Sequence, residues 1–266
     1  MRVVALRLAE GQRMADIVSF KPCVLVPVYN HHQRLAEGIE KIRQYDLPVI
    51  MVDDGSNDIC KSVMRDIAAN DAQVRLVERA ENGGKGAALK TGFRTALELG
   101  FSHALQIDAD GQHNILDIPR FLEISQASPN TLIAGKPEYD ESVPKGRFYG
   151  RYLTHVWVWI NTLSLDVKDS MCGFRVYPVR RSCELIAAES MGNRMDFDSE
   201  FMVRWHWRHW PLLQLSTRVI YPEQGVSHFH AWRDNKLISW MHTRLFFGML
   251  WRFPRLMANK FRAEAK

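Results

Sequence analysis

The chain has 266 residues and the composition of an ordinary folded protein, with 46% hydrophobic and 24% charged residues, which excludes a disordered tail, a collagen-like fibre and a low-complexity linker. Its net charge of +5 is concentrated at the end of the chain, because residues 232–266 contain eight basic and two acidic side chains. A near-neutral body with a basic end argues against nucleic-acid binding, in which positive charge is spread over a groove-facing surface.

Short apolar runs alternate with longer stretches of helical periodicity in the first half of the sequence. Strands are predicted over residues 23–28, 49–52, 74–77, 103–107 and 131–134. Helices are predicted from Ser56, which is placed as an N-cap, and over residues 87–99, 115–125 and 200–210. This alternation is typical of an α/β fold in which a mostly parallel sheet is covered by helices on both faces.

The chain divides into three predicted parts: a lead-in segment over residues 1–20, one continuous α/β domain over residues 21–230, and a basic amphipathic helical region over residues 231–266. The longest apolar stretches, at residues 152–165 and 237–253, are interrupted by polar residues and fall short of the ~20 apolar residues that span a membrane. The four cysteines are scattered without a CxxC pair, as in reduced cytosolic proteins. We therefore expect a protein that is soluble or lies on a membrane without crossing it.

Polar and glycine residues follow each of the first four predicted strands. In an open parallel sheet, ligands bind beyond the carboxyl ends of the strands, so these residues are predicted to converge on one pocket. They are Pro27, Tyr29 and Asn30 after the first strand, residues 53–56 after the second, residues 82–86 after the third and residues 108–113 after the fourth.

Asp108 and Asp110 lie two residues apart after the fourth strand, and Gln112 follows two residues later. Their oxygen atoms can reach one divalent cation, and an all-oxygen set suits Mg²⁺ or Mn²⁺ better than Zn²⁺. Such a site leaves positions for waters and for substrate phosphate oxygens. The alternative is a solvated acidic turn at the end of a strand.

Asp53 and Asp54 follow the second strand, where carboxylates can accept hydrogen bonds from a nucleotide base or from ribose hydroxyls. The alternative for this pair is a turn and helix cap. Residues 82–86 form a glycine loop that opens a helix, a place where backbone N–H groups face an anion. This loop matches neither GxxxxGK[ST] nor GxGxxG, and Lys85 within it is a candidate cation for a diphosphate or for the carboxylates after the second strand.

At these positions the sequence resembles the family 2 glycosyltransferases of the GT-A fold. The similarity runs in order from about residue 22 to 135, and a segment at residues 173–177 resembles the GFR-x-Y segment of dolichyl- and polyprenyl-phosphate sugar synthases. A narrower resemblance is to bacterial members that act in aryl polyene or other lipid pathways. The motifs that carry the family resemblance are VPVYN at residues 26–30, VDDGS at 52–56, NGGKG at 82–86 and QIDAD at 106–110.

The resemblance implies a role for each matching position. The donor, a UDP- or GDP-linked sugar, would be bound by Pro27, Tyr29, Asp53, Asp54, Lys85 and Asp108. Asp108, Asp110 and Gln112 would hold Mn²⁺ or Mg²⁺, which neutralises charge on the leaving nucleoside diphosphate. Family 2 enzymes invert the anomeric centre by direct displacement, so no covalent nucleophile is expected. The implied activity is that of a hexosyltransferase with a lipid or polyprenyl-phosphate acceptor.

The acceptor side is predicted from arginines and two further acidic residues. Guanidinium groups suit phosphate oxygens, and the candidates are Arg147, Arg151 and Arg175, with solvated arginines on a helix face as the alternative for the first two. A phosphate acceptor is already a nucleophile, whereas a hydroxyl acceptor requires a carboxylate base. Asp198 and Asp169 are the candidate bases, and helix capping competes for Asp198.

All eight tryptophans lie between residues 157 and 251, outside the predicted nucleotide-binding half. Their concentration beside a basic terminal segment predicts peripheral contact with anionic lipid at the cytoplasmic face of the inner membrane. A homodimer interface is an alternative use of the same residues, and core packing explains any single tryptophan.

Two other function classes compete with a glycosyltransferase. A sugar-1-phosphate nucleotidyltransferase also uses a parallel sheet and a cation, but it would carry a glycine- and arginine-rich loop directly after the first strand. A non-catalytic sugar-nucleotide-binding module would keep the fold, but the intact Asp53, Lys85, Asp108 and Asp110 argue against it.

Overall fold

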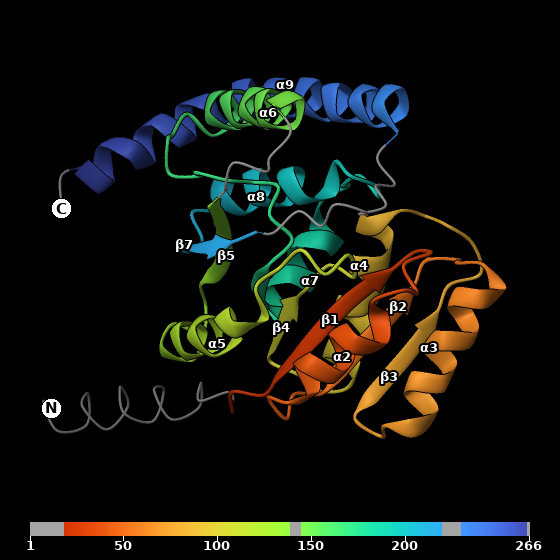
Figure 1. Cartoon of the computed structure of the whole chain (residues 1–266). Coiled ribbons are helices and arrows are strands. Elements are labelled where there is room, and N and C mark those ends of the chain that lie inside the picture. The colour runs from red at the N-terminus through yellow and green to blue at the C-terminus, as the bar shows by residue number, and fades with distance from the viewer. Residues whose placement is uncertain (1–18, 139–144, 220–229, 265–266) are drawn as a thin grey trace, which may run out of the picture.

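The computed structural model describes residues 19–138, 145–219 and 230–264, with the side chains of residues 145–149, 231 and 259–264 left out. Figure 1 shows an α/β fold in which one sheet is flanked by helices, with two long helices, α6 (Lys145–Thr162) and α9 (Ala231–Glu264), along one edge of the molecule. The predicted lead-in of residues 1–20 falls almost entirely outside the described residues.

The described part of the chain forms a seven-stranded sheet in the order β3-β2-β1-β4-β6-β5-β7. Six of these strands point the same way, and β6 runs antiparallel to both of its neighbours. The mostly parallel sheet predicted from the sequence is therefore confirmed. The strands are β1 (Pro22–Val28), β2 (Val49–Asp53), β3 (Val74–Glu78), β4 (His103–Gln106), β5 (Leu132–Glu138), β6 (Arg175–Pro178) and β7 (Leu212–Arg218).

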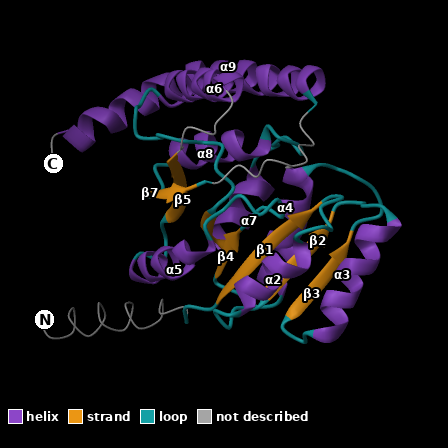
Figure 2. Ribbon diagram, viewed as in Figure 1, coloured by secondary structure: helices purple, strands orange, loops and turns teal. Residues whose placement is uncertain are grey.

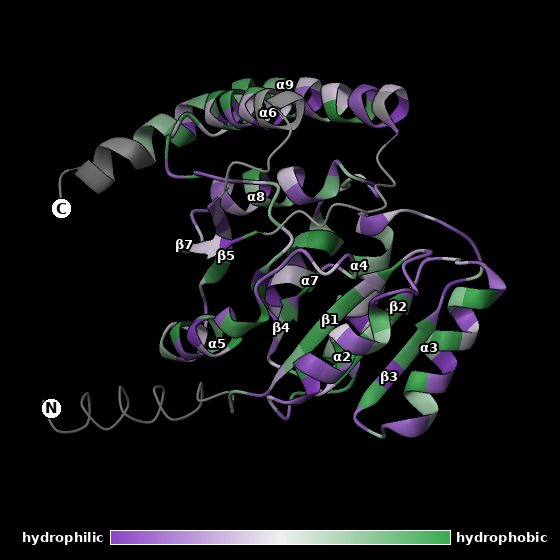
Figure 3. Cartoon of the chain, viewed as in Figure 1, coloured by the Kyte–Doolittle hydropathy of each residue, from purple (hydrophilic) through white to green (hydrophobic). Residues whose placement is uncertain are grey.

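The central strands are buried on both faces because helices cover each side of the sheet. Leu25 of β1 packs in one core cluster and Val24 and Val26 in the other, as the alternation of side chains along a strand requires. Figure 3 shows the hydrophobic character of β1 and β2. The remaining helices are α2 (Leu35–Arg43), α3 (Asp58–Asn70), α4 (Lys85–Glu98), α5 (Ile118–Ala127), α7 (Val179–Ala188) and α8 (Phe197–Trp207).

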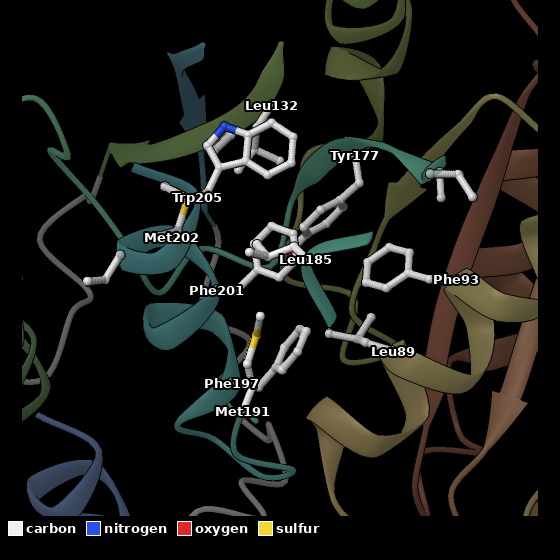
Figure 4. Close-up of a cluster of buried hydrophobic side chains, with 14 of the residues drawn as sticks. Leu89, Phe93, Leu132, Tyr177, Leu185, Met191, Phe197, Phe201, Met202 and Trp205 are labelled. Carbon is white, nitrogen blue, oxygen red and sulfur yellow. The ribbon is translucent and has the colours of Figure 1, made fainter. Parts of the chain in front are cut away.

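The side chains of α2, α3 and α5 belong to one core cluster, and those of α4, α7 and α8 belong to the other. Figure 4 shows part of the second cluster, where the rings of Phe93, Tyr177 and Phe201 meet. In Figure 2, α6 and α9 lie alongside each other above α8, and both contact α8. No helix within residues 19–138, 145–219 and 230–264 is long and apolar enough to cross a membrane.

Helix boundaries differ from the predicted ones by one to three residues. The N-cap of α3 is Asn57, whose Oδ1 accepts a hydrogen bond from the Cys60 backbone N–H, and the prediction of Ser56 was wrong by one position. The Ser56 hydroxyl instead accepts from the Asn30 backbone N–H and joins the turns after β1 and β2. The helix predicted at residues 200–210 spans Phe197–Trp207, which places Asp198 in its first turn.

Candidate active site

The carboxyl ends of the central strands lie together because their register is shared. Val28, the last residue of β1, pairs with Asp53, the last residue of β2. The backbone N–H of Arg79, directly after β3, donates to the Asp53 carbonyl, and that of Ile107, directly after β4, donates to the Leu25 carbonyl. The turns after four strands therefore meet at one edge of the sheet, as the sequence predicts.

Asp53 is completely buried at this edge. Its Oδ1 accepts a hydrogen bond from the Ser56 backbone N–H at 2.8 Å, whereas its Oδ2 has no hydrogen-bond partner among the described residues. A buried carboxylate oxygen without a donor is costly, so this atom suits a hydrogen bond from a bound ligand. The predicted partners Pro27 and Tyr29 lie at the end of the neighbouring strand β1, both partly exposed.

Asp54 holds the glycine loop instead of facing a ligand. Its Oδ1 accepts from Arg79 at 2.9 Å and from the Gly83 backbone N–H at 3.1 Å, and its Oδ2 accepts from the Gly84 backbone N–H at 2.7 Å. Burial raises the pKa of Asp54, and the three donors oppose this increase. The chain itself supplies donors to both oxygens of Asp54, and its predicted contact with the donor stays a prediction.

Lys85 joins two carboxylates that are far apart in the sequence. Its Nζ lies 2.8 Å from Oδ2 of Asp108 and 2.9 Å from Oδ2 of Asp198. Burial by itself would lower the pKa of the Lys85 ammonium, but the two carboxylates outweigh it and hold that pKa well above its usual value. Of the two predicted roles of Lys85, the structure does not show the pairing with a carboxylate after the second strand, because its partners follow β4 and open α8. Its role towards a diphosphate stays a prediction.

Asp108 is held on several sides. Its Oδ1 accepts from Gln106 Nε2 at 3.0 Å, and Nε2 of His113 lies 3.6 Å from its Oδ2. A Cβ added to Gly173 would lie 2.0 Å from that same Oδ2, so only glycine leaves room for the carboxylate. Burial would raise the pKa of Asp108, but Lys85 and His113 hold it well below its ordinary value.

The donor set around Asp108 and Asp110 fits a hard divalent cation. Asp110 is partly exposed, and its Oδ1 accepts from the Gln112 backbone N–H at 3.0 Å. The Lys85 ammonium lies against Asp108, which indicates a place where positive charge is stabilised. Within the described residues, no three His, Cys, Asp or Glu side chains form a complete metal cage. A magnesium-type ion that keeps waters and binds substrate phosphates needs only one or two protein carboxylates.

Asp169 was predicted as a base and Arg151 as an acceptor-binding residue. In the structure they bind each other. Arg151 Nε lies 2.6 Å from Asp169 Oδ2, and Nη2 lies 2.7 Å from Oδ1. Asp169 Oδ1 also accepts from the backbone N–H groups of Met171 and Cys172. Burial would raise the pKa of Asp169, but Arg151 and His155 hold it well below its ordinary value. A carboxylate held ionised in this way is a weak base, and the predicted role of Asp169 as a base stays a prediction.

Arg175, which was predicted to bind the acceptor, is fully buried in this structure, and its role at the acceptor stays a prediction. Its guanidinium donates to the carbonyl oxygens of Ser170, Cys172 and Asp198. These bonds fasten the segment before β6 to the start of α8, and so place Asp198 beside Lys85. The side chain of Arg147, the third predicted acceptor-binding arginine, lies outside the described residues.

Sequence reasoning missed four residues that support the site: Gln106, Tyr177, Arg79 and His113. Gln106 is a buried amide at the end of β4, and a polar residue in an otherwise apolar strand was the available signal. Arg79 follows β3 directly and binds Asp54. Nothing in the local sequence pattern connects Tyr177 to Asp108, because that link depends on the antiparallel pairing of β6 with β4.

The sequence profile of glycosyl transferase family 2 matches residues 23–181. The chain belongs to this family. It is 29% identical over 188 residues to the undecaprenyl-phosphate mannosyltransferase of Micrococcus luteus, which covers 66% of this chain and 75% of that one. It is also 26% identical over 193 residues to the polyprenol monophosphomannose synthase of Mycolicibacterium smegmatis, which covers 66% of this chain and 69% of that one.

Solved glycosyltransferases share the fold at low sequence identity. The mannosyltransferase of Pyrobaculum calidifontis, solved with GDP-Man and Mn²⁺, superposes with a TM-score of 0.55 at 18% identity, covering 98% of this chain and 82% of that one. Staphylococcus aureus TarS with UDP-GlcNAc superposes with a TM-score of 0.54 at 13% identity, covering 92% and 76%. The GT-A-like fold is confirmed, and family 2 membership sets aside the nucleotidyltransferase and the non-catalytic module.

Proposed function

We propose that this family 2 glycosyltransferase moves a hexose from a nucleoside-diphosphate sugar to a lipid phosphate, with inversion and with Mn²⁺ or Mg²⁺ as cofactor. The observation that carries the proposal is the Lys85 ammonium between the carboxylates of Asp108 and Asp198 at the carboxyl edge of the sheet. This arrangement concentrates opposite charges where a diphosphate and its cation would bind.

The donor would lie over the ends of β1, β2 and β4. The unpartnered Oδ2 of Asp53 suits a donor hydrogen from the nucleotide, with Pro27 and Tyr29 beside it. Asp108 and Asp110, with Gln112, would hold the cation, which neutralises negative charge on the departing nucleoside diphosphate. Lys85 adds a further positive charge next to Asp108.

The acceptor is proposed to be a phosphate because both candidate bases are already paired with cations. Asp169 is bound by Arg151, and Asp198 is bound by Lys85. A hydroxyl acceptor would need one of them to take its proton, whereas a phosphate oxygen is already anionic. In the step, a phosphate oxygen forms a bond to the anomeric carbon while the bond from that carbon to the nucleoside diphosphate breaks. The Micrococcus luteus relative, a transferase to undecaprenyl phosphate, supports this acceptor class.

Donor hydrolysis and transfer test this proposal with one variant and one control. Asp110→Ala should lower Mn²⁺-stimulated turnover by about a hundredfold or more, because a charge-stabilising contact to the leaving group is lost. Asp66→Ala, which removes an exposed carboxylate from α3, is the matched control and should leave turnover unchanged. Transfer to polyprenyl phosphate, with the product's anomeric configuration opposite to the donor's, supports inversion. Equal turnover with and without Mn²⁺ or Mg²⁺ contradicts the metal role.

The outward face of α9 is proposed as the surface that meets the membrane. Met241, Leu245 and Met249 of α9 are buried against the protein. At the opposite positions of the helix, Trp240 and Trp251 are 60% and 86% exposed. Apolar side chains on a solvent-facing helix surface are unusual, since that face is normally polar. Further exposed apolar residues on these two helices are Tyr152, Leu153, Trp157 and Ile160 of α6 and Trp232, Phe247, Leu250 and Phe253 of α9.

The basic residues of α9 favour an anionic lipid bilayer as the partner that contacts this face. Arg244 and Arg252 of α9 turn inward and pair with Glu200 and Glu189. Among the α9 side chains that the structure describes, Arg233, Lys236 and Arg255 are also basic and exposed, and Arg233 lies 3.5 Å from Asp234. Aromatic and basic side chains together are typical of helices that lie in the interface of an anionic bilayer.

Vesicle sedimentation tests the surface. Vesicles with phosphatidylglycerol should bind the wild-type protein several-fold better than the Trp240→Gln, Trp251→Gln double variant. Ile59→Gln, at an exposed apolar position on α3, is the control and should bind as the wild type does. Equal binding by the double variant and the wild type contradicts membrane docking by α9. Loss of a dimer without loss of vesicle binding points to a second copy as the occupant.

A further inference from the structure

A chain of hydrogen bonds reaches Asp108 from inside the protein. Arg175 Nη1 donates to the Tyr177 hydroxyl at 3.4 Å, and this hydroxyl donates to Gln106 Oε1 at 3.0 Å. Gln106 Nε2 then donates to Asp108 Oδ1 at 3.0 Å. Arg175, Tyr177 and Gln106 are all completely buried, so water does not compete for these contacts.

Arg175 and Asp108, the two ends of this series of hydrogen bonds, fix the direction of each bond in it. A guanidinium has only donors, and an ionised carboxylate has only acceptors. Tyr177 must therefore accept from Arg175 and pass its single hydroxyl proton to Gln106. The Gln106 amide then has one orientation, with its oxygen towards Tyr177 and its nitrogen towards Asp108. With the amide reversed, a carbonyl oxygen would face the Asp108 carboxylate.

Packing keeps the Tyr177 hydroxyl in place. Its ring packs against those of Phe93 and Phe201, with centroid distances of 4.8 and 5.2 Å and interplanar angles of 60° and 82° (Figure 4). Gln106 and Arg175 are register partners in the antiparallel pair of β4 and β6. The hydrogen bonds have little freedom to rearrange, because two aromatic neighbours hold the Tyr177 ring and the sheet register holds Gln106 opposite Arg175.

We propose that Gln106 and Tyr177 are positioning residues that fix the Asp108 carboxylate for the cation of the donor complex. This inference rests on the proposed metal-dependent function. Gln106 holds Oδ1, which leaves Oδ2 directed to the side where Lys85 lies. Groups that hydrogen-bond to a carboxylate ligand set its orientation, and losing them typically weakens metal binding by about 10–100-fold.

Direct Mn²⁺ binding, followed by the electron paramagnetic resonance signal of the free ion, tests the proposal without any turnover. Gln106→Met keeps the side-chain volume and removes the donor to Asp108. Tyr177→Phe keeps the ring and removes the hydroxyl that orients the amide. Each variant should raise the Kd for Mn²⁺ by about tenfold or more. Because Tyr177 acts only through Gln106, the double variant should bind Mn²⁺ no more weakly than Gln106→Met alone.

A matched control separates positioning from general loss of stability. Ser182 is completely buried just after β6, and its hydroxyl donates to the Pro178 carbonyl at 2.9 Å, away from Asp108. Ser182→Ala should lower the melting temperature about as much as Tyr177→Phe does, with the Kd for Mn²⁺ unchanged. A rise in the Kd of Ser182→Ala equal to that of Tyr177→Phe overturns the proposal.

The remaining outcomes separate this inference from the proposed function. Wild-type affinity for Mn²⁺ in both single variants overturns the positioning role and leaves the metal-dependent function standing. Additive effects in the double variant also overturn it, because they show that Tyr177 acts by another route. If the wild-type protein does not bind Mn²⁺ even with the nucleoside diphosphate present, the metal-dependent function and this inference both fail.

Discussion

Replacing Asp169 with Asn separates a structural carboxylate from a catalytic base. Asp169 pairs with Arg151 on α6 and accepts the backbone N–H groups of Met171 and Cys172. Asparagine keeps the shape but removes the charge and places an NH₂ group among these donors. We expect Asp169→Asn to lose stability while its folded fraction keeps its rate of sugar transfer.

The size of the stability loss follows from the burial of the pair. The Asp169 side chain is 4% exposed and that of Arg151 is 17% exposed. Breaking a buried ion pair from one side costs about 3–5 kcal/mol, and the partial exposure of Arg151 places this case near about 3 kcal/mol. For a chain of this size about 1 kcal/mol corresponds to about 2–4 °C, so the melting temperature should fall by about 6–12 °C.

Thermal unfolding and transfer kinetics on the same sample distinguish a structural role of Asp169 from a catalytic one. Arg151→Met should lower the melting temperature by a similar amount, because it removes the other half of the pair. Loss of a general base typically costs about 10²–10⁴ in rate. A rate reduction of that size in Asp169→Asn, with an unchanged melting temperature, would refute the structural role.

The pH dependence of stability and two glycine substitutions give further predictions. Because the folded protein lowers the pKa of Asp169, the stability this residue adds is present above the unfolded-state value of about 3.9 and is lost as the pH falls below it. Urea unfolding should therefore show a constant gap between wild type and Asp169→Asn above about pH 5 that narrows below about pH 4. Gly173→Ala should remove most transfer activity at a small cost in stability, because its Cβ would displace the Asp108 carboxylate. Gly92→Ala should lower stability and leave most transfer activity in the folded protein, because its Cβ would overlap the buried Leu25 side chain. Melting curves and transfer rates of the two variants check these expectations.

The sequence predicted the sheet well because its signal is local. Runs of buried β-branched residues separated by helical periodicity indicated the first five strands to within a few residues. The acidic and glycine residues at the strand ends then identified the pocket edge, since parallel strands share that edge. Neither β6 nor β7 was predicted, and the reversed direction of β6 depends on its pairing with β4 and β5, which its four residues do not encode.

The partners of the acceptor-side arginines could not be predicted from the sequence. Their residue type indicated that Arg151 and Arg175 suit a phosphate. It did not predict whether another part of the chain already binds them. Arg151 is paired with a carboxylate 18 residues away, and Arg175 with backbone carbonyls on both sides of its strand. Such partners are set by tertiary packing, which a motif at one position does not encode.

The three acidic residues at the start of α8 illustrate how one local pattern divides into separate roles. Asp196, Asp198 and Glu200 alternate in sequence, and helix capping was a competing explanation for Asp198. Asp196 accepts from the Arg194 backbone N–H at the N-cap. Glu200 turns away from Lys85 and binds Arg244, so α9 is fastened to the same helix that carries Asp198. The helix proposed to meet the membrane and the carboxylate that meets Lys85 are therefore joined through one turn of α8, which places lipid contact and sugar transfer on connected parts of the fold.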